Sequence, residues 1–229
     1  MKRRTLIAGG LLLPLAYCGY RIRPSSFRVK MTVAVDTPEG LKTGASVFEI
    51  SASDNIIKLP FNAISTSFKG EAVAVDLGGG QTLFALLRTP KDNSDPMTTI
   101  LRLLASPANR RAESWLPAIR ELSEAQALGR KAVIPRDEYP MLVRFKDNNE
   151  PNSVEVVDPD DLKKSFGDGI SIKSIGFEIT REALKSQIPS AFSWWSDLKN
   201  SQLDGSRYHN SNSVANELNR MDFRKGFES

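Results

Sequence analysis

Few side chains in this 229-residue chain are of a type that could perform chemistry on their own. The single histidine, His209, lies within Tyr208–Ser213, where a nearby hydroxyl and an acid could in principle complete a Ser-His-Asp triad. The chain has no Gly-x-Ser-x-Gly sequence to hold a nucleophilic serine, and this segment is rich in Asn and Ser. We therefore expect His209 to be a solvated surface histidine, and the sequence predicts no catalytic residue.

Metal-binding residue types are scarce or poorly spaced. One histidine and one cysteine, Cys18, exclude multi-histidine metal sites, cysteine clusters and an intrachain disulfide. The acidic sequence Asp158–Asp161 lacks the Asp-x-Asp-x-Asp-Gly pattern of a calcium loop, and a hard cation prefers six or more oxygen ligands. We expect these acids to cap and begin a short helix that ends near Gly167. The sequence predicts neither a metal nor a cofactor.

The sequence Ala74–Thr82 places Asp76 just before three consecutive glycines, Gly78 to Gly80. Over about nine residues it resembles a phosphate-binding hairpin of the actin and heat-shock-chaperone ATPase superfamily, in which backbone N–H groups approach a nucleotide phosphate. That superfamily uses two such motifs in duplicated domains, and this chain has no second copy. We expect the glycines to supply positive φ angles in a tight hairpin turn, with nucleotide binding at Asp76–Gly80 as a remote alternative.

Phe192, Trp194 and Trp195 form an aromatic cluster in the sequence. Clustered aromatic side chains of this kind often bind a partner, line a ligand groove or lie against a membrane surface. They also serve as a hydrophobic plug on a β-sandwich, and this is the interpretation we favour. The cluster is nevertheless the best candidate in the sequence for a partner-binding surface.

The charge distribution separates the N-terminus from the rest of the chain. Residues 1–30 contain seven Lys and Arg and no acid, which leaves the remainder with a net charge of −3. Because a nucleic-acid-binding domain needs a basic patch on its folded body, we do not expect nucleic acid as a partner. Lys2–Arg4 followed by the uncharged, mostly apolar run Leu6–Tyr20 is typical of an export signal or a short membrane anchor.

The sequence leaves open whether this N-terminal segment is acylated, cleaved or kept as a membrane anchor. Leu15–Cys18 resembles a lipoprotein signal, in which Cys18 would be acylated, although Tyr17 departs from the small residue usual before that cysteine. An uncleaved anchor competes, although the run is shorter than the roughly 20 residues of a spanning helix and contains Pro14. Arg3–Ile7 also resembles a twin-arginine export signal. All of these place the body in the cell envelope, facing the periplasm, with the membrane as a partner of the N-terminal segment.

The sequence of the body, residues 25–198, predicts mostly antiparallel strands. Phe27–Val35 alternates with a period of two, and Thr37–Gly40 is a turn signal before a second strand over 43–51. Residues 70–77 and 81–88 flank the glycines as a second hairpin, whose near-continuous apolar character predicts cover on both faces. Further strands are expected over 141–145, 154–157 and 170–179, the last with a β-bulge near Lys173–Ser174, where the apolar phase slips once.

Two longer helices are expected between the strands. Asp95 is the predicted N-cap of one, with Pro96 at its first position, and the other runs from Pro117 to Leu128 and stops at Gly129. About seven strands with a helical insertion near 95–129 predict a mainly β (α+β) chain with an antiparallel, sandwich-like body. The predicted organisation is an N-terminal segment over 1–24, a strand-rich domain over 25–198 and a partly irregular tail over 199–229.

The stretches Val33–Val47, Glu71–Leu87 and Tyr139–Phe166 resemble those of a group of proteobacterial envelope proteins that have no assigned activity. These proteins are small and carry an N-terminal signal or anchor, so the resemblance implies an envelope location and no catalytic motif. We therefore expect a tethered, non-enzymatic envelope module that binds a protein or a surface component, with a periplasmic hydrolase of unknown substrate as the alternative. A flat apolar patch around Trp194 and Trp195 would favour the first, and a deep pocket with convergent acids would favour the second.

Overall fold

The computed structural model describes residues 25–54, 64–90, 93–112 and 114–227. The predictions about the N-terminal segment 1–24, including acylation of Cys18, lie outside the described residues. Within the described ranges, no helix combines the length and the apolar character needed to cross a membrane.

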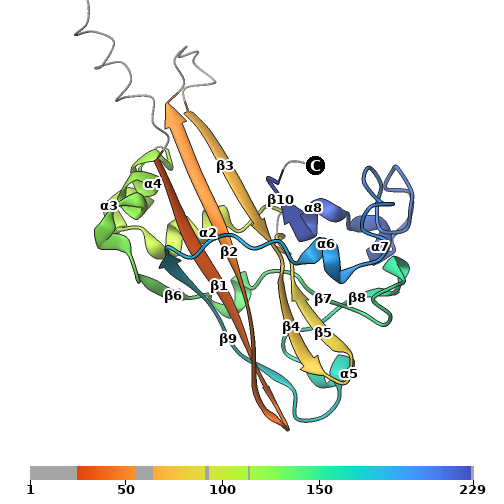
Figure 1. Ribbon diagram of the computed structural model, residues 1–229. Coiled ribbons are helices and arrows are strands. Elements are labelled where there is room, and N and C mark those ends of the chain that lie inside the picture. The colour runs from red at the N-terminus through yellow and green to blue at the C-terminus, as the bar shows by residue number, and fades with distance from the viewer. Residues whose placement is uncertain (1–24, 55–63, 91–92, 113, 228–229) are drawn as a thin grey trace, which may run out of the picture.

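Ten strands form two antiparallel sheets in the described part of the chain (Figure 1). This confirms the prediction of a mainly β fold with a sandwich-like body. The additional strands relative to the predicted seven or so include β6 and β10, which are too short to produce an alternating pattern. The six-stranded sheet has the order β10 (Arg224–Lys225), β3 (Ile64–Glu71), β2 (Gly40–Asp54), β1 (Ser25–Thr37), β9 (Ser171–Thr180) and β6 (Lys131–Val133). The four-stranded sheet has the order β4 (Val73–Gly78), β5 (Gln81–Ala85), β7 (Leu142–Phe145) and β8 (Val154–Val156).

Helical segments are short and lie between or after the strands. The insertion between β5 and β6 contains α2 (Met97–Leu104), α3 (Pro107–Arg110), α4 (Leu116–Ser123) and the 3-10 turn η1 (Ala125–Ala127). The other segments are η2 (Arg136–Glu138), η3 (Pro151–Ser153), α5 (Leu162–Phe166), α6 (Ile188–Ala191), α7 (Val214–Glu217) and α8 (Arg220–Phe223).

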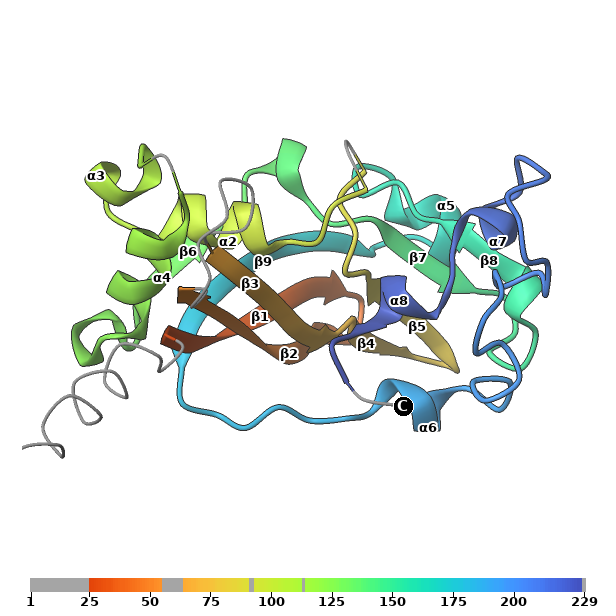
Figure 2. The ribbon, with the colours of Figure 1, turned by 90° about the horizontal axis from the view of Figure 1, so that it is seen from above.

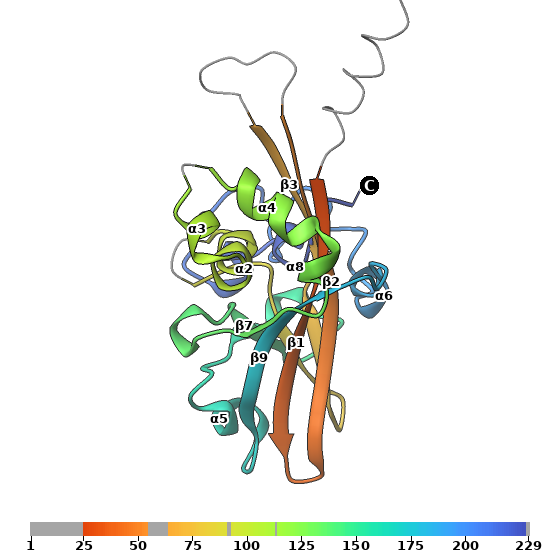
Figure 3. The ribbon, with the colours of Figure 1, turned by 90° about the vertical axis from the view of Figure 1, so that its left-hand side faces the viewer.

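The first core lies on the inner face of the six-stranded sheet. Alternate residues of β1 from Phe27 to Val35 are buried there, as the period-two pattern predicts. Helices α2 to α4 cover one end of this face, with α4 packed on β1 and β2, and the four-stranded sheet covers the other end (Figures 2 and 3). The inner face of the six-stranded sheet is thus covered by helices at one end and by the second sheet at the other.

Two local irregularities lie where the sequence predicts them. Ala34 pairs with Ser174 and Val35 pairs with Ile172, so Lys173 is the extra residue of the predicted bulge in β9. The β4–β5 hairpin turns at Gly78, Gly79 and Gly80, whose φ angles are 91°, 61° and 77°. Both confirm interpretations that rest on local side-chain pattern and backbone geometry alone.

The predicted strand over 70–77 is wrong in its boundaries, because it joins parts of two strands. β3 ends at Glu71 in the six-stranded sheet and β4 begins at Val73 in the other, so the extended chain changes sheets at Ala72. The backbone N–H of Ala72 donates to the carbonyl of Phe223 instead of to a strand neighbour. After this change of sheet, the chain in β4 still lies close to β2. A Cβ atom added at Gly44 of β2 would lie 2.1 Å from the carbonyl oxygen of Ala74 in β4.

A second core lies on the outer face of the four-stranded sheet. β5 is covered on both faces, as predicted, because Leu83 and Ala85 belong to the first core and Phe84 to the second. The same prediction is wrong for β4, an edge strand that is covered on one face only, with Ala74 and Asp76 exposed. The C-terminal tail over 199–229 contains few regular elements, yet it contributes Leu203, Ala215, Leu218 and Phe223 to this second core.

The predicted helices exist with shifted ends. α2 begins at Met97, one residue late, and Asp95 Oδ1 accepts from the Met97 N–H at 3.1 Å. The helix expected from Pro117 to Leu128 begins at Leu116 and is interrupted at Glu124, whose backbone is extended. α5 begins at Leu162, so that Asp161 and not Asp158 precedes it, and it ends before Gly167 as predicted.

Glu121 holds the helical insertion together. Its carboxylate accepts hydrogen bonds from the Ser106 N–H at 3.0 Å and from Asn109 Nδ2 at 2.7 Å, and it pairs with Arg130. Burial alone would raise the pKa of Glu121, but the hydrogen bonds from Arg130, Asn109 and Ser106 outweigh burial and hold the pKa at about 2. This single carboxylate therefore joins α4 to the start of α3 and to the residue before β6.

We expect this interaction to make the stability of the protein depend on pH. Since the folded-state pKa lies below the usual value of 4.5, the stabilisation is present above about pH 4.5 and is lost as pH falls towards 2. It amounts to at most about 3 kcal/mol. Urea unfolding of Glu121→Gln should show a lower free energy at pH 7 and a flatter pH profile, whereas the neighbouring Glu124→Gln should behave like the wild type. Equal profiles for the two variants would contradict this role.

Candidate functional site

The sequence-predicted loop Asp76–Gly80 lies at the tip of the β4–β5 hairpin. Asp76 Oδ1 accepts a hydrogen bond from the Gly78 N–H at 2.9 Å, so the carboxylate stabilises its own turn. Side chains added at the three glycines would meet no atom within 4 Å. The glycines are therefore required by backbone geometry and not by a neighbouring group, which agrees with the interpretation as a turn.

The other polar candidates also have local roles. Asp158 Oδ1 accepts from the Asp160 N–H at 2.9 Å, and Asp160 pairs with Arg136 at 2.7 Å. His209 is exposed, as predicted. Among the described residues, no group of three or more His, Cys, Asp or Glu side chains is placed to hold a metal ion.

Phe192, Trp194 and Trp195 lie inside the second core. They are only 3%, 6% and 7% exposed, and the Phe192 ring stacks on Trp194 at a centroid distance of 4.6 Å. The indole N–H of Trp194 donates to the Asn148 carbonyl at 2.9 Å, and Arg220 covers Trp195 at 4.4 Å. These rings lie in the second core and present no flat apolar patch, which agrees with the favoured interpretation of the cluster as a hydrophobic plug.

An open groove of about 410 Å³, which we call the β8 groove, is lined by Leu142 and Val157 of the first core and by Met141, which packs against the second. Its volume is within the range of pockets that bind small ligands or the side chains of a peptide. Its walls are mainly apolar and come from four parts of the chain: residues 88, 90 and 93, residues 140–142, residues 156–159 and residue 217. The apolar lining residues are Pro90, Pro140, Met141, Leu142, Val156, Val157 and Pro159.

Arg88 forms the polar wall of the β8 groove. The residue is only 7% exposed, and its guanidinium donates to Asn93 Oδ1 at 2.9 Å and to the Glu217 carbonyl at 3.2 Å. It also forms ion pairs with the carboxylates of Glu217 and Asp222. Burial raises the pKa of Asp222, against the lowering effects of the Asn219 N–H and of Arg88. Arg88 is thus fully occupied inside the protein and fixes the position of α7 beside the groove.

The mouth of the groove carries excess negative charge. Its charged lining residues are two carboxylates, Asp158 and Glu217, and one arginine, Arg88. Glu217 pairs with Arg88, and Asp158 pairs with Arg136 at the longer distance of 3.8 Å. The side chains of Asp158 and Glu217 are 65% and 51% exposed, so both can still interact with a cation from outside.

β8 brings a strand edge to the groove. It is the outermost strand of the four-stranded sheet, with β7 as its neighbour. The Val157 N–H donates to Leu142 and the Lys146 N–H donates to Ser153, which fixes the alternation of the β7–β8 ladder. In an antiparallel pair the intervening residues direct their backbone groups away from the partner strand, so Val156 presents its N–H and C=O outward. Its side chain is 49% exposed beside the groove.

Sequence reasoning did not find this groove. Arg88 and Glu217 are 129 residues apart, and nothing in the local pattern of either segment indicates the other. The one available signal is that an arginine directly follows the buried apolar run Leu83–Leu87, a position where a charged side chain needs a partner. Comparisons with protein-family models, with curated proteins and with solved structures found no match to this chain.

Proposed function

We propose that the chain is an exported or membrane-anchored envelope protein, whose body is a non-enzymatic binding module facing the periplasm. The basic and apolar N-terminal sequence supports the location, and the β8 groove supports the binding role. The observation that carries the proposal is an apolar groove directly beside an outward-facing strand edge. This combination suits an extended segment of a partner protein, which would add to β8 by backbone hydrogen bonds and place a side chain in the groove.

The charge at the groove defines the chemistry of the partner. The exposed carboxylates of Asp158 and Glu217 flank an otherwise apolar lining. An extended apolar segment that carries one Lys or Arg complements this surface, whereas an acidic segment would be repelled. The expected partner is therefore a basic, β-forming stretch of an envelope protein.

The hydrolase alternative has less support at this groove. Its described lining residues include no Ser, Thr, Cys, Tyr or His that could serve as a nucleophile or general base. The two flanking carboxylates are widely solvated, and the one neighbouring group with a raised pKa, Asp222, is occupied by the Asn219 N–H and by Arg88. A rigid pocket with paired internal charges is better suited to binding than to proton transfer.

A peptide-binding experiment tests this proposal. The probe is a fluorescent peptide of roughly nine residues with alternating Val and Thr and one central Lys, titrated against the full-length protein in detergent, with fluorescence anisotropy as the readout. Val156→Lys removes the apolar contact and repels the peptide, so we expect its affinity to fall at least about tenfold, a loss of 1.4 kcal/mol or more.

The chain offers a matched control for this variant. Val133 is 70% exposed on β6, one of the two edge strands of the six-stranded sheet, and Val133→Lys should leave the affinity unchanged. A peptide in which Glu replaces Lys should bind more weakly than the Lys peptide. The proposal is wrong if no peptide binds saturably, or if both valine variants weaken binding equally.

A further inference from the structure

A second hollow lies on the outer face of the six-stranded sheet, opposite the first core. It shares no residue with the β8 groove. Residues 181–187, which we call the strap, connect β9 to α6 without forming a helix or strand. The strap crosses in front of β1 and β2 (Figure 1). Between the strap and the sheet lies a partly enclosed cavity of about 100 Å³, the strap pocket.

Both ends of the strap are fastened by carboxylates. At one end, Glu182 pairs with Lys30 of β1. At the other, Glu71 accepts hydrogen bonds from the backbone N–H groups of Gln187 and Ile188 at 2.6 and 3.1 Å, and from the Ser186 hydroxyl at 3.0 Å. Glu71 also pairs with Arg224 at 2.8 Å. The strap is therefore held in place over the pocket, and both carboxylates are already neutralised by a cation.

The pocket lies beneath the strap at the point where β3 separates from β2 in the six-stranded sheet. The β2–β3 ladder ends at the pair Glu49–Lys69, and the chain then passes to the other sheet. The opening is lined by residues 45–47 of β2 and by Glu71, Ala72 and Ala74. Taking roughly 30 Å³ for one water in the liquid, the space corresponds to about three waters, which is also enough for a phosphate or a carboxylate group.

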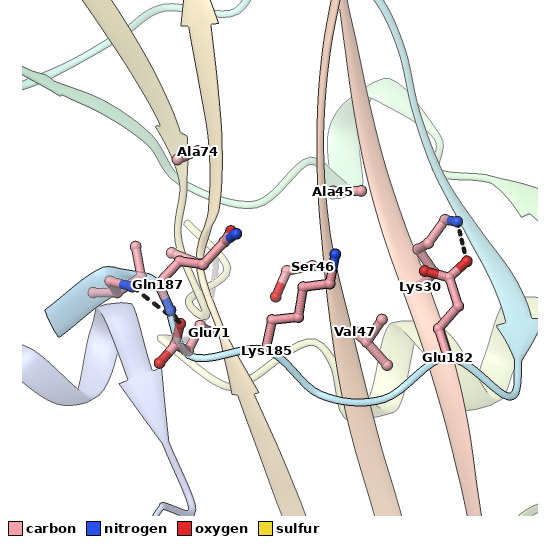
Figure 4. Close-up of a pocket in the computed structure, with 11 residues that line it drawn as sticks. Lys30, Ala45, Ser46, Val47, Glu71, Ala74, Glu182, Lys185 and Gln187 are labelled. Carbon is pink, nitrogen blue, oxygen red and sulfur yellow. Dashed lines mark hydrogen bonds and ion pairs between the residues drawn. The ribbon is translucent and has the colours of Figure 1, made fainter. Parts of the chain in front are cut away.

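Three hydrogen-bond donors surround this space without another assigned role. Figure 4 shows the Lys185 ammonium, the Gln187 amide and the Ser46 hydroxyl around the same opening. Among the described residues, no hydrogen bond or ion pair occupies these three side-chain groups. Since Lys30 and Arg224 neutralise Glu182 and Glu71, the charge of Lys185 is the one left uncompensated in the lining.

We infer that the strap pocket binds a small oxyanion, either free or as the terminal group of a larger molecule. Lys185 supplies the charge, and Gln187 and Ser46 supply neutral donors from two different chain segments. Such charge-assisted hydrogen bonds are about twice as strong as neutral ones, which makes Lys185 the principal contributor. The anion would also bridge the strap to β2, because Lys185 and Gln187 belong to the first and Ser46 to the second.

The test titrates the full-length protein in detergent with inorganic phosphate, with acetate and with sodium chloride at matched ionic strength. Isothermal titration calorimetry gives the affinity, and the shift in melting temperature gives an independent readout. We expect phosphate or acetate to bind saturably and to stabilise the fold beyond the effect of chloride. The comparison of phosphate with acetate identifies which group the pocket prefers.

Lys185→Gln should weaken the binding of the preferred anion at least about tenfold, and Ser46→Ala should weaken it less. Lys199→Gln is the matched control, because Lys199 is also an exposed lysine but lies outside the pocket lining. Absence of saturable binding by both anions would overturn the inference, as would equal losses in the two lysine variants. Neither result bears on the β8 groove, which Val156→Lys tests separately.

Discussion

Replacement of Glu71 with alanine is expected to lower the free energy of unfolding by about 3–5 kcal/mol. The Glu71 side chain is only 3% exposed and accepts four hydrogen bonds, from Ser186, Gln187, Ile188 and Arg224. Its removal leaves two backbone N–H groups and a largely buried guanidinium without their acceptor, and the desolvation cost of each is then uncompensated. Chemical unfolding monitored by circular dichroism measures the loss.

Glu49→Ala is the matched control for this prediction. Glu49 also pairs with an arginine, Arg28, but both side chains are more than a third exposed. Exposed ion pairs contribute about 1 kcal/mol or less, so the control should remain close to the wild type. Hydrogen exchange gives a second readout, because the amides of Gln187 and Ile188 should lose protection in Glu71→Ala. Similar losses in the two variants would show that Glu71 does not fasten the strap.

The sequence predicts those parts of this fold that depend on neighbouring residues. The alternation in β1, the bulge at Lys173 and the glycine turn after β4 follow from the period of two and from positive φ angles. β5 is correctly predicted to be covered on both faces, because its apolar run leaves no polar face for water. Each of these features can be derived from fewer than about a dozen consecutive residues.

Features that depend on distant residues were missed. The chain passes from one sheet to the other at Ala72 because its N–H bonds to Phe223, which lies about 150 residues later. The polar tail packs through four apolar residues and through the fully buried Asn216, whose amide bonds to Asp204, Ser206, Tyr208 and Asn210. Composition indicates an irregular tail, but it contains no information about where such a tail packs.

The two candidate sites could not be predicted from the sequence for the same reason. Neither the β8 groove nor the strap pocket contains a sequence motif, since their polar residues come from segments that meet only in the folded chain. Arg88 and Glu217 form one, and Lys185, Gln187 and Ser46 form the other. The aromatic cluster lies in the second core, as the favoured interpretation of a hydrophobic plug predicts, and Met141 both packs against this core and lines the groove.

This role of the aromatic cluster makes a second large effect predictable. Phe192 is 3% exposed and its ring centroid lies 5.0 Å from Phe145 and 5.3 Å from Phe84, which anchors it between two strands of the four-stranded sheet. Phe192→Ala would leave a cavity that the surrounding rings cannot fill, and we expect a loss of about 3–5 kcal/mol in the free energy of unfolding. Phe192→Leu keeps most of the volume and should lose less.

An exposed aromatic residue provides the control. Tyr208 is 78% exposed, so Tyr208→Ala should change the stability by no more than about 0.5 kcal/mol. Tryptophan fluorescence gives a direct view of the site, because Trp194 and Trp195 adjoin Phe192 and their emission should shift to the red when water enters the cavity. If Phe192→Ala retained wild-type stability and emission while losing a binding activity, the cluster would be a partner surface after all. A large loss of stability in Phe192→Ala with none in Tyr208→Ala would instead support its role as a hydrophobic plug on the four-stranded sheet.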